Sequence, residues 1–291
     1  MQNLDAKGDE LPQHEVTLDS DYYVAEYEIT QSLWEAVMGT DVYDMYAALT
    51  RPSVYPNPVG VAYPMYYVYT KDILEFARKL SQMTGLKFRL PTEAEWEFAA
   101  KGGNRSHGYL YAGSNNVDSV AWYGNKGMQQ VGQLMPNELG IYDMTGNSWE
   151  LCLDGYAAYP TYSQTNPLVP LKTETVVRGG SSYSSWNESN YLITYRLNRA
   201  PNALHNRNTL RLVLSDEVVV KTIVVDNKMA FNMRMVDGGT FTMGDDSSNN
   251  TSPAHQVTLS DYYIGQTEVT QALWKIIMGT NPSADTTCLQ N

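Results

Sequence analysis

The stretch Phe88-Arg-Leu-Pro-Thr-Glu-Ala-Glu-Trp-Glu-Phe-Ala-Ala100 carries the strongest local folding signal in the chain. Thr92 and Glu95 have the spacing of a capping box, in which each side chain accepts a hydrogen bond from the other residue's backbone N–H at the start of a helix. Pro91 stands immediately before this pair, and Gly102-Gly103 follows the last apolar residues. The stretch therefore predicts a short helix that begins after Thr92 and ends before the two glycines.

Two further helices are predicted on the N-terminal side of this stretch, and a different pattern follows it. Thr30 can cap a helix whose apolar residues share one face and which ends at Gly39. Another helix is expected from about Lys71 to Met83. From Gly108 to Leu214, Gly, Asn, Ser and Pro residues separate short apolar pieces, which is typical of short strands joined by long loops. The expected fold class is therefore α+β.

The chain also contains an internal repeat. Residues 21–40 read DYYVAEYEITQSLWEAVMGT and residues 261–280 read DYYIGQTEVTQALWKIIMGT, so eleven of the twenty positions are identical. Because a spacing of 240 residues is far longer than a solenoid unit, the repeat indicates two whole domains in tandem. The helix predicted after Thr30 is accordingly expected again after Thr270.

The segment between the two copies has the character of two strands. Residues 218–225 and 229–236 are joined by a short polar segment that suits a tight turn. The second copy carries Met235–Gly244, for which the first copy has no counterpart, and we expect this strand or its neighbour to pair with the first copy. The sequence thus predicts a first domain at 1–215 that lacks its N-terminal strand, and a truncated second copy at 216–291.

Composition and charge argue against several functional classes. The net charge of −12 repels phosphate backbones, so nucleic-acid binding is not expected. The apolar runs are too short to form a transmembrane segment. The two cysteines, Cys152 and Cys288, form no CxxC pattern, which argues against a thiolate zinc site.

Four motifs resemble those of the formylglycine-generating enzyme, or sulfatase-modifying factor, domain family. They are Phe88–Ala100, PNELGIYDMTGNSWE at 136–150, RGGS at Arg178–Ser181 and GTFTMG at 239–244. The similarity extends over roughly residues 10–214 and resumes near residue 230. It implies an irregular, loop-rich, C-type-lectin-like fold. It also implies divergent functions, since members include copper-dependent oxidases of a sulfatase cysteine, iron-dependent sulfoxide synthases and ligand-binding proteins without catalysis.

The residues that redox chemistry would need in this family are missing from the first copy. The copper-binding cysteine pair of the formylglycine-generating enzymes lies after the RGGS motif, and residues 182–211 contain no cysteine. The iron-dependent branch needs a histidine cluster, whereas the four histidines here include no i, i+4 pair. We therefore expect no catalytic residues, and a divergent oxidoreductase with other metal ligands is the alternative.

Glu93, Glu95 and Glu97 have two interpretations. They could form a catalytic carboxylate cluster, but Glu95 fits the capping box and the other two suit the positive N-terminal end of the predicted helix. No nucleophile elbow or phosphate-binding glycine loop accompanies them. The structural interpretation is therefore favoured.

The resemblance implies a calcium site in the loop Asp143–Glu150, because the formylglycine-generating enzymes bind calcium with the matching segment. Carried over by position, the ligands are the side chains of Asp143 and Glu150 and the carbonyl oxygens of Gly146 and Ser148. Carboxylates and carbonyls are the donors that Ca²⁺ prefers. The alternative is that both acids only bind the loop backbone. A ligand role predicts that Glu150→Ala lowers thermal stability only when calcium is present.

The late loops are the candidate ligand surface. The stretch Ser181–Asn208 is rich in Tyr, Asn and Ser, a mixture that recognition loops favour. The residues expected to bind a ligand are Tyr183, Trp186, Asn187, Tyr191, Asn198, Asn202 and Asn206. The alternative is a structural stretch that is solvated and binds nothing.

Together these observations predict a calcium-stabilised scaffold without catalysis, which binds a protein or carbohydrate ligand through its late loops. A divergent metal-dependent oxidoreductase and a purely structural tandem module are the alternatives. The resemblance favours a secreted or cell-envelope location.

Overall fold

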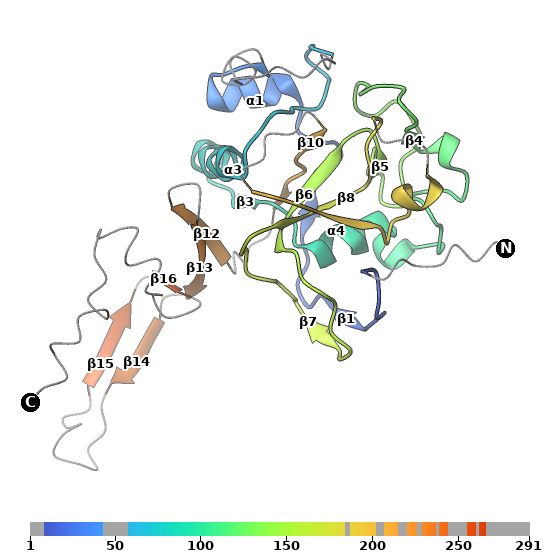
Figure 1. The fold of residues 1–291 in the computed structure, drawn as a ribbon. Helices are drawn as coiled ribbons and strands as arrows, with labels where there is room; N and C mark the ends of the chain where they lie inside the picture. The colour runs from blue at the N-terminus through green and yellow to red at the C-terminus, as the bar shows by residue number, and fades with distance from the viewer. Residues whose placement is uncertain are drawn as a thin grey trace, which may run out of the picture. The chain divides into compact units, whose positions relative to one another are not determined.

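The computed structural model describes residues 9–42, 58–183, 187–201, 207–214, 220–225, 229–236, 239–243, 255–259 and 262–265. The chain divides into two compact units, Met1–Glu217 and Val218–Asn291. Each unit forms its own sheets (Figure 1).

The α-helices described in the first unit are α1 (Gln31–Met38), α3 (Thr70–Thr84) and α4 (Glu93–Ala100). α1 begins where the N–H of Leu33 donates to Thr30 Oγ1 at 3.3 Å, and it ends at Gly39 in the left-handed conformation. α4 begins with the predicted reciprocal pair, in which Glu95 N–H donates to Thr92 Oγ1 at 3.2 Å and Thr92 N–H donates to Glu95 Oε2 at 2.8 Å. All three helices predicted in the first copy are confirmed. No helix in the described residues combines the length and apolar character needed to cross a membrane.

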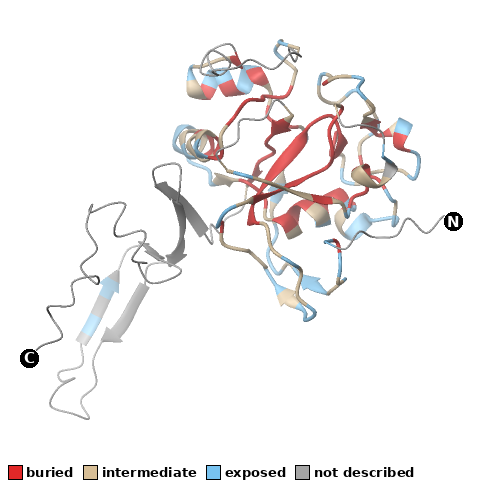
Figure 2. Cartoon of the chain, viewed as in Figure 1, coloured by how far each residue is buried: buried red, intermediate tan, exposed pale blue. Residues whose placement is uncertain are grey.

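A four-stranded sheet lies at the centre of the first unit (Figure 1). The strand order is β10 (Asn208–Thr209), β6 (Trp149–Gly155), β8 (Thr175–Arg178) and β9 (Arg196–Arg199). β10 runs parallel to β6, and the other neighbours are antiparallel. Both central strands, β6 and β8, are buried along their whole length (Figure 2).

The two faces of this sheet contribute to different hydrophobic clusters, because successive residues of a strand point to opposite faces. Trp149, Leu151 and Leu153 belong to a cluster that includes side chains of α1 and α3. Cys152, which lies between them in sequence, belongs to a second cluster with Trp96 of α4. α4 therefore covers one face of the sheet, and α1 and α3 contribute to the core on the other.

Short strands and turns connect these elements. β11 (Val213–Leu214) lies between β2 (Tyr23–Val24) and β3 (Phe88–Arg89), whereas β1 (Val16–Thr17) pairs with β7 (Gln164–Thr165) and β4 (Ala121–Trp122) pairs with β5 (Thr145–Gly146). Single 3-10 turns occur at Gly103–Arg105, Val117–Ser119 and Glu188–Tyr191. The unit is therefore the irregular, loop-rich α+β fold that the sequence predicts.

The second unit contains two small antiparallel sheets. β13 (Met229–Val236) pairs with β12 (Val220–Val225) on one side and with β16 (Tyr262–Gly265) on the other, and β14 (Gly239–Met243) pairs with β15 (His255–Leu259). The two strands predicted around the turn are confirmed. The partners described for β13 and β14 lie within their own unit, and the expected pairing of Met235–Gly244 with the first copy stays a prediction. The helix expected after Thr270 lies outside the described residues.

Candidate functional site

The loop from Asp143 to Glu150 packs tightly against its neighbours. Asp143 and Asn147 both have positive φ, at 60° and 52°, and Gly146 has φ 84°. A Cβ atom on Gly146 would collide with the carbonyl oxygen of Trp122, so only glycine fits where β5 lies beside β4. The predicted turn is therefore confirmed, and close backbone packing explains its glycine.

Glu150 is fully buried, and protein donors bind both of its carboxylate oxygens. Arg211 donates from Nε to both oxygens at 3.0 Å and from Nη2 to Oε1 at 2.6 Å. Trp96 Nε1 donates to Oε2 at 2.6 Å. The remaining Arg211 contacts go to the carbonyl oxygens of Ala25 and Tyr142, both at 2.8 Å. Glu150 therefore ties β6 to α4 and to the chain segment around Arg211.

Glu28 lies in the same buried region and was not predicted as part of a site. Its Oε2 accepts a hydrogen bond from Asn147 Nδ2 at 2.6 Å, and its Oε1 is buried without a partner among the described residues. Burial raises the pKa of Glu28 well above its ordinary value, and the charges of Asp143 and Glu150 raise it further. The repeat could have pointed to this residue, because a glutamate occupies the same position in both copies, as Glu28 and Glu268.

Two of the four expected calcium ligands, Glu150 and Asp143, are engaged by donors of the protein. Glu150 is engaged by Arg211 and Trp96, and Asp143 Oδ2 accepts the N–H of Gly132 at 2.7 Å. Within the described residues, no three His, Cys, Asp or Glu side chains gather closely enough to hold a metal ion. The donor set around Glu150 therefore does not fit calcium, and calcium binding to this chain stays a prediction.

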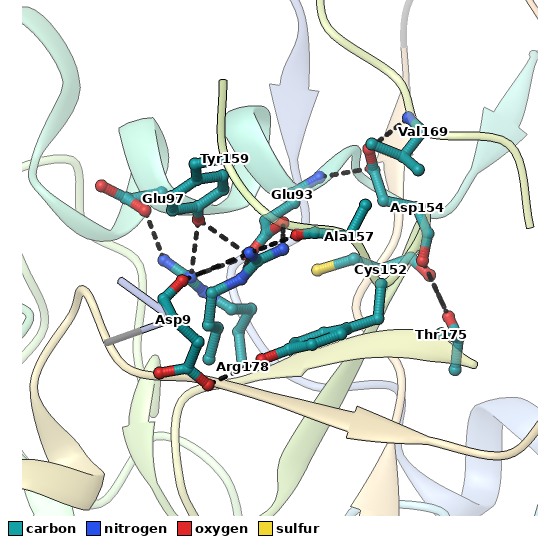
Figure 3. Close-up of polar contacts among 12 residues, drawn as sticks. Asp9, Glu93, Glu97, Cys152, Asp154, Ala157, Tyr159, Val169, Thr175 and Arg178 are labelled. Atoms are coloured by element: carbon teal, nitrogen blue, oxygen red, sulfur yellow. Dashed lines mark hydrogen bonds and ion pairs between the residues drawn. The ribbon is translucent and has the colours of Figure 1, made fainter. Parts of the chain in front are cut away.

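A second buried ion network joins α4 to the central sheet (Figure 3). Arg178 donates to Glu93 Oε1 at 2.9 Å and to Glu97 Oε2 at 2.5 Å. Arg196 donates to both oxygens of Glu93, at 2.9 and 2.6 Å. The hydroxyl of Tyr159 donates to Glu93 Oε1 at 3.0 Å. Each of these charges is therefore neutralised by partners inside the protein.

Strand register and helix spacing produce this network. Glu150 of β6 lies opposite Arg178 of β8, which in turn lies opposite Arg196 of β9. Glu93 and Glu97 are four residues apart, so they extend from the same side of α4. Burial opposes the charge of Arg178, but Glu97 and its neighbours outweigh burial and raise the pKa of Arg178. The capping role of Glu95 is confirmed, whereas Glu93 and Glu97 bind arginines that were not predicted as their partners.

Cys152 and Asp154 lie close to this network and are also buried (Figure 3). Burial is the main factor that raises the pKa of the Cys152 thiol, which disfavours the thiolate needed for redox or metal chemistry. Asp154 accepts the N–H groups of Glu93 at 2.7 Å and Val169 at 2.8 Å. Burial nevertheless raises the pKa of Asp154 to about 7. Cys152 is therefore a core residue, and Asp154 fixes the start of α4.

The predicted ligand residues do not all lie on the surface. Tyr183 is partly buried and Asn187 is exposed, whereas Asn198 donates to Glu174 Oε2 at 2.6 Å. The prediction for Tyr191 is wrong, because its side chain is completely buried and its hydroxyl donates to the Ser181 carbonyl oxygen at 3.1 Å. The predicted residues outside the described ranges are Trp186, Asn202 and Asn206.

A cleft of about 810 Å³ lies beside the ion network around Glu93 in the first unit. It is bordered by residues 10–18, by the start of α4 and by the 157–169 segment, with Glu93 and Tyr159 in its wall. Tyr162, which is 67% exposed, also lines it. Thr194 and Arg196 of the late-loop stretch line this cleft, but none of the predicted ligand residues belongs to its described lining.

The short mixed sheet, covered by helices and joined by long loops, defines an α+β fold of the sulfatase-modifying-factor type. The model of the family described as "Sulfatase-modifying factor enzyme 1-like domain" matches residues 1–215 and 221–286. The chain belongs to this family.

Three relatives show how widely the family has diverged. The "Chaperone protein LppX" of Paenibacillus barcinonensis is 32% identical over 246 residues, which is 69% of this chain and 82% of that protein. The formylglycine-generating enzyme of Thermomonospora curvata is 31% identical over 140 residues, or 41% of this chain and 44% of the enzyme. The solved structure of Treponema denticola variable protein 1 superposes with a TM-score of 0.57 at 27% identity, and covers 66% of this chain and 84% of that one.

Proposed function

We propose that this chain is a recognition scaffold without catalysis, which binds a protein partner through the late loops of its first unit. The proposal rests on where the cysteines lie in the sequence and on the burial of Cys152. Residues 182–211, where the resemblance to the oxidases requires a pair of thiols, contain none, and Cys152 is buried beneath α4. Cu(I) coordination needs accessible thiolates, which these residues do not supply.

The internal pairing of the charged residues supports the same proposal. Glu93, Glu97 and Glu150 each bind an arginine, so no free carboxylate among them is ready to act as a general base. A similar function is suggested by the relative named as a chaperone, which matches this chain over most of its length. That name favours a protein partner over a carbohydrate one.

Calcium stabilisation is a separate part of the proposal, and the geometry around Glu150 does not support it. We therefore assign calcium no role in partner binding. A measurement of the metal content of the purified chain tests for calcium and for the redox metals that an oxidoreductase would carry.

Two assays separate the proposed function from its alternatives. The chain is first supplied with copper and a cysteine-containing sulfatase peptide, and we expect no oxidation, which mass spectrometry measures. It is then screened against protein and glycan arrays, and each ligand found is titrated against Tyr183→Ala and against Tyr162→Ala, whose side chain lines the cleft.

We expect a protein ligand whose affinity falls with Tyr183→Ala and is unchanged by Tyr162→Ala. Oxidation of the peptide would establish the oxidoreductase instead. A ligand found only on the glycan array would replace the protein partner with a carbohydrate, and sensitivity to Tyr162→Ala alone would move the site to the cleft. An absence of any ligand would favour the structural module.

A further inference from the structure

The cleft beside α4 has a buried carboxylate in its wall that the ion networks of the first unit leave out. Glu10 lines the cleft, and only 6% of its surface is exposed. Its Oε2 atom accepts the hydroxyl of Thr194 at 2.7 Å, whereas its Oε1 atom is buried and accepts no hydrogen bond from any residue in the described ranges. Because burying an unpaired acceptor is costly, this oxygen has the capacity for a donor that none of the described residues supplies.

The other acidic side chains that line this cleft already have their partners. Lys101 binds Glu97 Oε1 at 2.5 Å, and Arg196 binds both oxygens of Glu93. Asp154 accepts two backbone N–H groups. Neither Lys101 nor Arg196 forms an ion pair with Glu10 in the part of the chain that the structure describes. Glu10 is therefore the carboxylate of the described wall that keeps an acceptor for a ligand.

The same cleft also offers aromatic and apolar surface. Tyr162 is 67% exposed, and Leu11 and Phe98 are 49% and 39% exposed. The ring of Tyr159 already binds a cation, because the Cζ atom of Arg196 lies 4.0 Å from its centre. A positive group is attracted to the face of an aromatic ring, and the methylene groups of a long cationic chain pack on apolar surface. The wall therefore suits a ligand with an aliphatic stem and a cationic end.

The size of the cleft and the chemistry of the carboxylate narrow the choice of ligand. A volume of about 810 Å³ is typical of sites for small molecules and single side chains. A primary ammonium group has three N–H donors and no acceptor, so it matches a carboxylate that lacks donors. A hydroxyl group brings no charge, and a quaternary ammonium group has no N–H to donate. A primary amine therefore fits the wall better than either.

We propose that this cleft is a binding site for a primary alkylammonium group, which binds the Glu10 carboxylate while its stem packs on Tyr162. A free aliphatic amine and the side chain of a lysine residue share this chemistry. The net charge of −12 attracts either ligand to the chain. Tyr183, on which the proposed function depends, does not belong to the described lining of the cleft. The site is therefore a second one, and neither assignment rests on the other.

The test titrates the full chain by calorimetry with cadaverine, a free amine, and with Nα-acetyl-lysine methylamide, which presents a lysine side chain. Pentanediol, which has the same stem as cadaverine, is the uncharged comparison. The variants are Glu10→Gln and Tyr162→Ala. Glu15→Gln is the control for charge, because it removes an exposed carboxylate of the same segment that is not part of the described lining. Tyr23→Ala is the control for an exposed ring, since Tyr23 is 77% exposed and also lies outside that lining.

We expect Glu10→Gln to bind the amine at least about tenfold more weakly than the parent, because a charge-assisted hydrogen bond is lost. Tyr162→Ala should weaken binding about threefold, which is the size of a cation–π contact at an exposed site. Both controls should bind as the parent does, and pentanediol should not bind detectably. Gln keeps an oxygen that can accept the Thr194 hydroxyl, so circular dichroism should show that Glu10→Gln retains the folded state.

The source of the amine follows from which probe binds. Binding of one probe alone identifies a free amine or a lysine side chain as the ligand, and binding of both supports the site for their shared chemistry. If neither probe binds the parent, the inference is overturned. Equal binding to the parent and to Glu10→Gln overturns it as well, and so does comparable binding of pentanediol. An equal loss in Glu15→Gln and Glu10→Gln would mean that only the overall negative charge attracts the amine, which also overturns the site.

Tyr183→Ala separates this inference from the proposed function. We expect that variant to bind the amine as the parent does. If amine binding falls with Tyr183→Ala and not with Glu10→Gln, the amine binds at the late loops, so the inference fails and the proposed function stands. If the amine binds at Glu10 and the arrays reveal no partner for the late loops, the inference stands and the proposed function fails.

Discussion

At the residue scale, Glu28 is a buried carboxylate with no ion-pair partner among the described residues. Arg211 pairs with Glu150, so no arginine or lysine is described as a partner of Glu28. Removing a carboxylate from water without a counter-ion is costly, and the raised pKa of Glu28 expresses that cost as a preference for the protonated form.

The variant Glu28→Gln should therefore be more stable than the parent at alkaline pH. In the unfolded chain the pKa of a glutamate is about 4.3. Because the folded-state pKa is raised, the contribution of Glu28 to stability is fully present below that value and is lost as pH rises through the folded pKa. Gln keeps an oxygen to accept from Asn147, so we expect a gain on the order of 1 kcal/mol at pH 8 that disappears toward pH 4.

Urea unfolding at both pH values measures this gain, with the exposed Glu26→Gln as the control. A Glu28→Gln variant that is less stable than the parent at pH 8 would show that the carboxylate has a cationic partner in solution. If that partner is calcium, added calcium should stabilise the parent more than the Glu28→Gln variant.

The geometry of Glu150 changes what its removal should do. Glu150→Ala leaves the buried guanidinium of Arg211 without a counter-ion, which costs about 3–5 kcal/mol when one partner of a buried pair is removed. Because this pair does not involve a metal, we expect the same loss of thermal stability in calcium and in chelator. A calcium-dependent loss would support the ligand role that the sequence suggested. Asp143→Asn serves as the comparison in the same loop.

At the element scale, α4 is held by two kinds of contact. Its start is fixed by local partners, since Thr92 and Glu95 bind each other's backbone and Asp154 accepts the N–H of Glu93. Its side chains then bind arginines on strands β8 and β9. The helix has only eight residues, and isolated helices of that length are unstable in water, so both kinds of contact are needed.

Removal of the N-cap should weaken this attachment by a modest amount. Thr92→Ala deletes the acceptor for the Glu95 N–H and should lower the free energy of unfolding by about 1 kcal/mol. Thr92→Ser keeps the hydroxyl and should remain close to the parent. Chemical denaturation of both variants gives the comparison, and equal stability of the alanine and serine variants would contradict the capping role.

At the scale of the whole molecule, several buried acids shift the pH dependence in one direction. Burial raises the pKa of Asp154 to about 7, and burial also raises the pKa of Glu28 and Asp143. Each of these groups binds its proton more tightly in the folded state than in the unfolded one. Unfolding should therefore become easier as pH rises from about 4 to about 7.

We expect the first unit to be less stable at pH 8 than at pH 5 by at least about 1 kcal/mol. Tryptophan fluorescence during denaturation reports on this unit, because Trp34, Trp96 and Trp149 are buried in its core. A stability that increases over this range would mean that lowered carboxylate pKa values, such as that of Glu97 beside Arg178, dominate instead.

Much of the fold followed from signals that span only a few residues. The capping box of α4, the caps of α1 and the two strands that follow residue 218 were all predicted in their places. The motifs that identify the family were equally visible. In the candidate site, the tight turn at Gly146 and the capping role of Glu95 were predicted correctly.

The tertiary structure alone decided which charges meet and which side chains are buried. Glu150 binds Arg211, 61 residues away, and Glu93 binds Arg196, 103 residues away. These pairs depend on strand order and register, which spacing along the chain does not specify. The same reason explains why the burial of Tyr191 was not predicted. A local cap is determined by its own neighbours, whereas a buried ion pair exists only once the sheet has brought distant strands together.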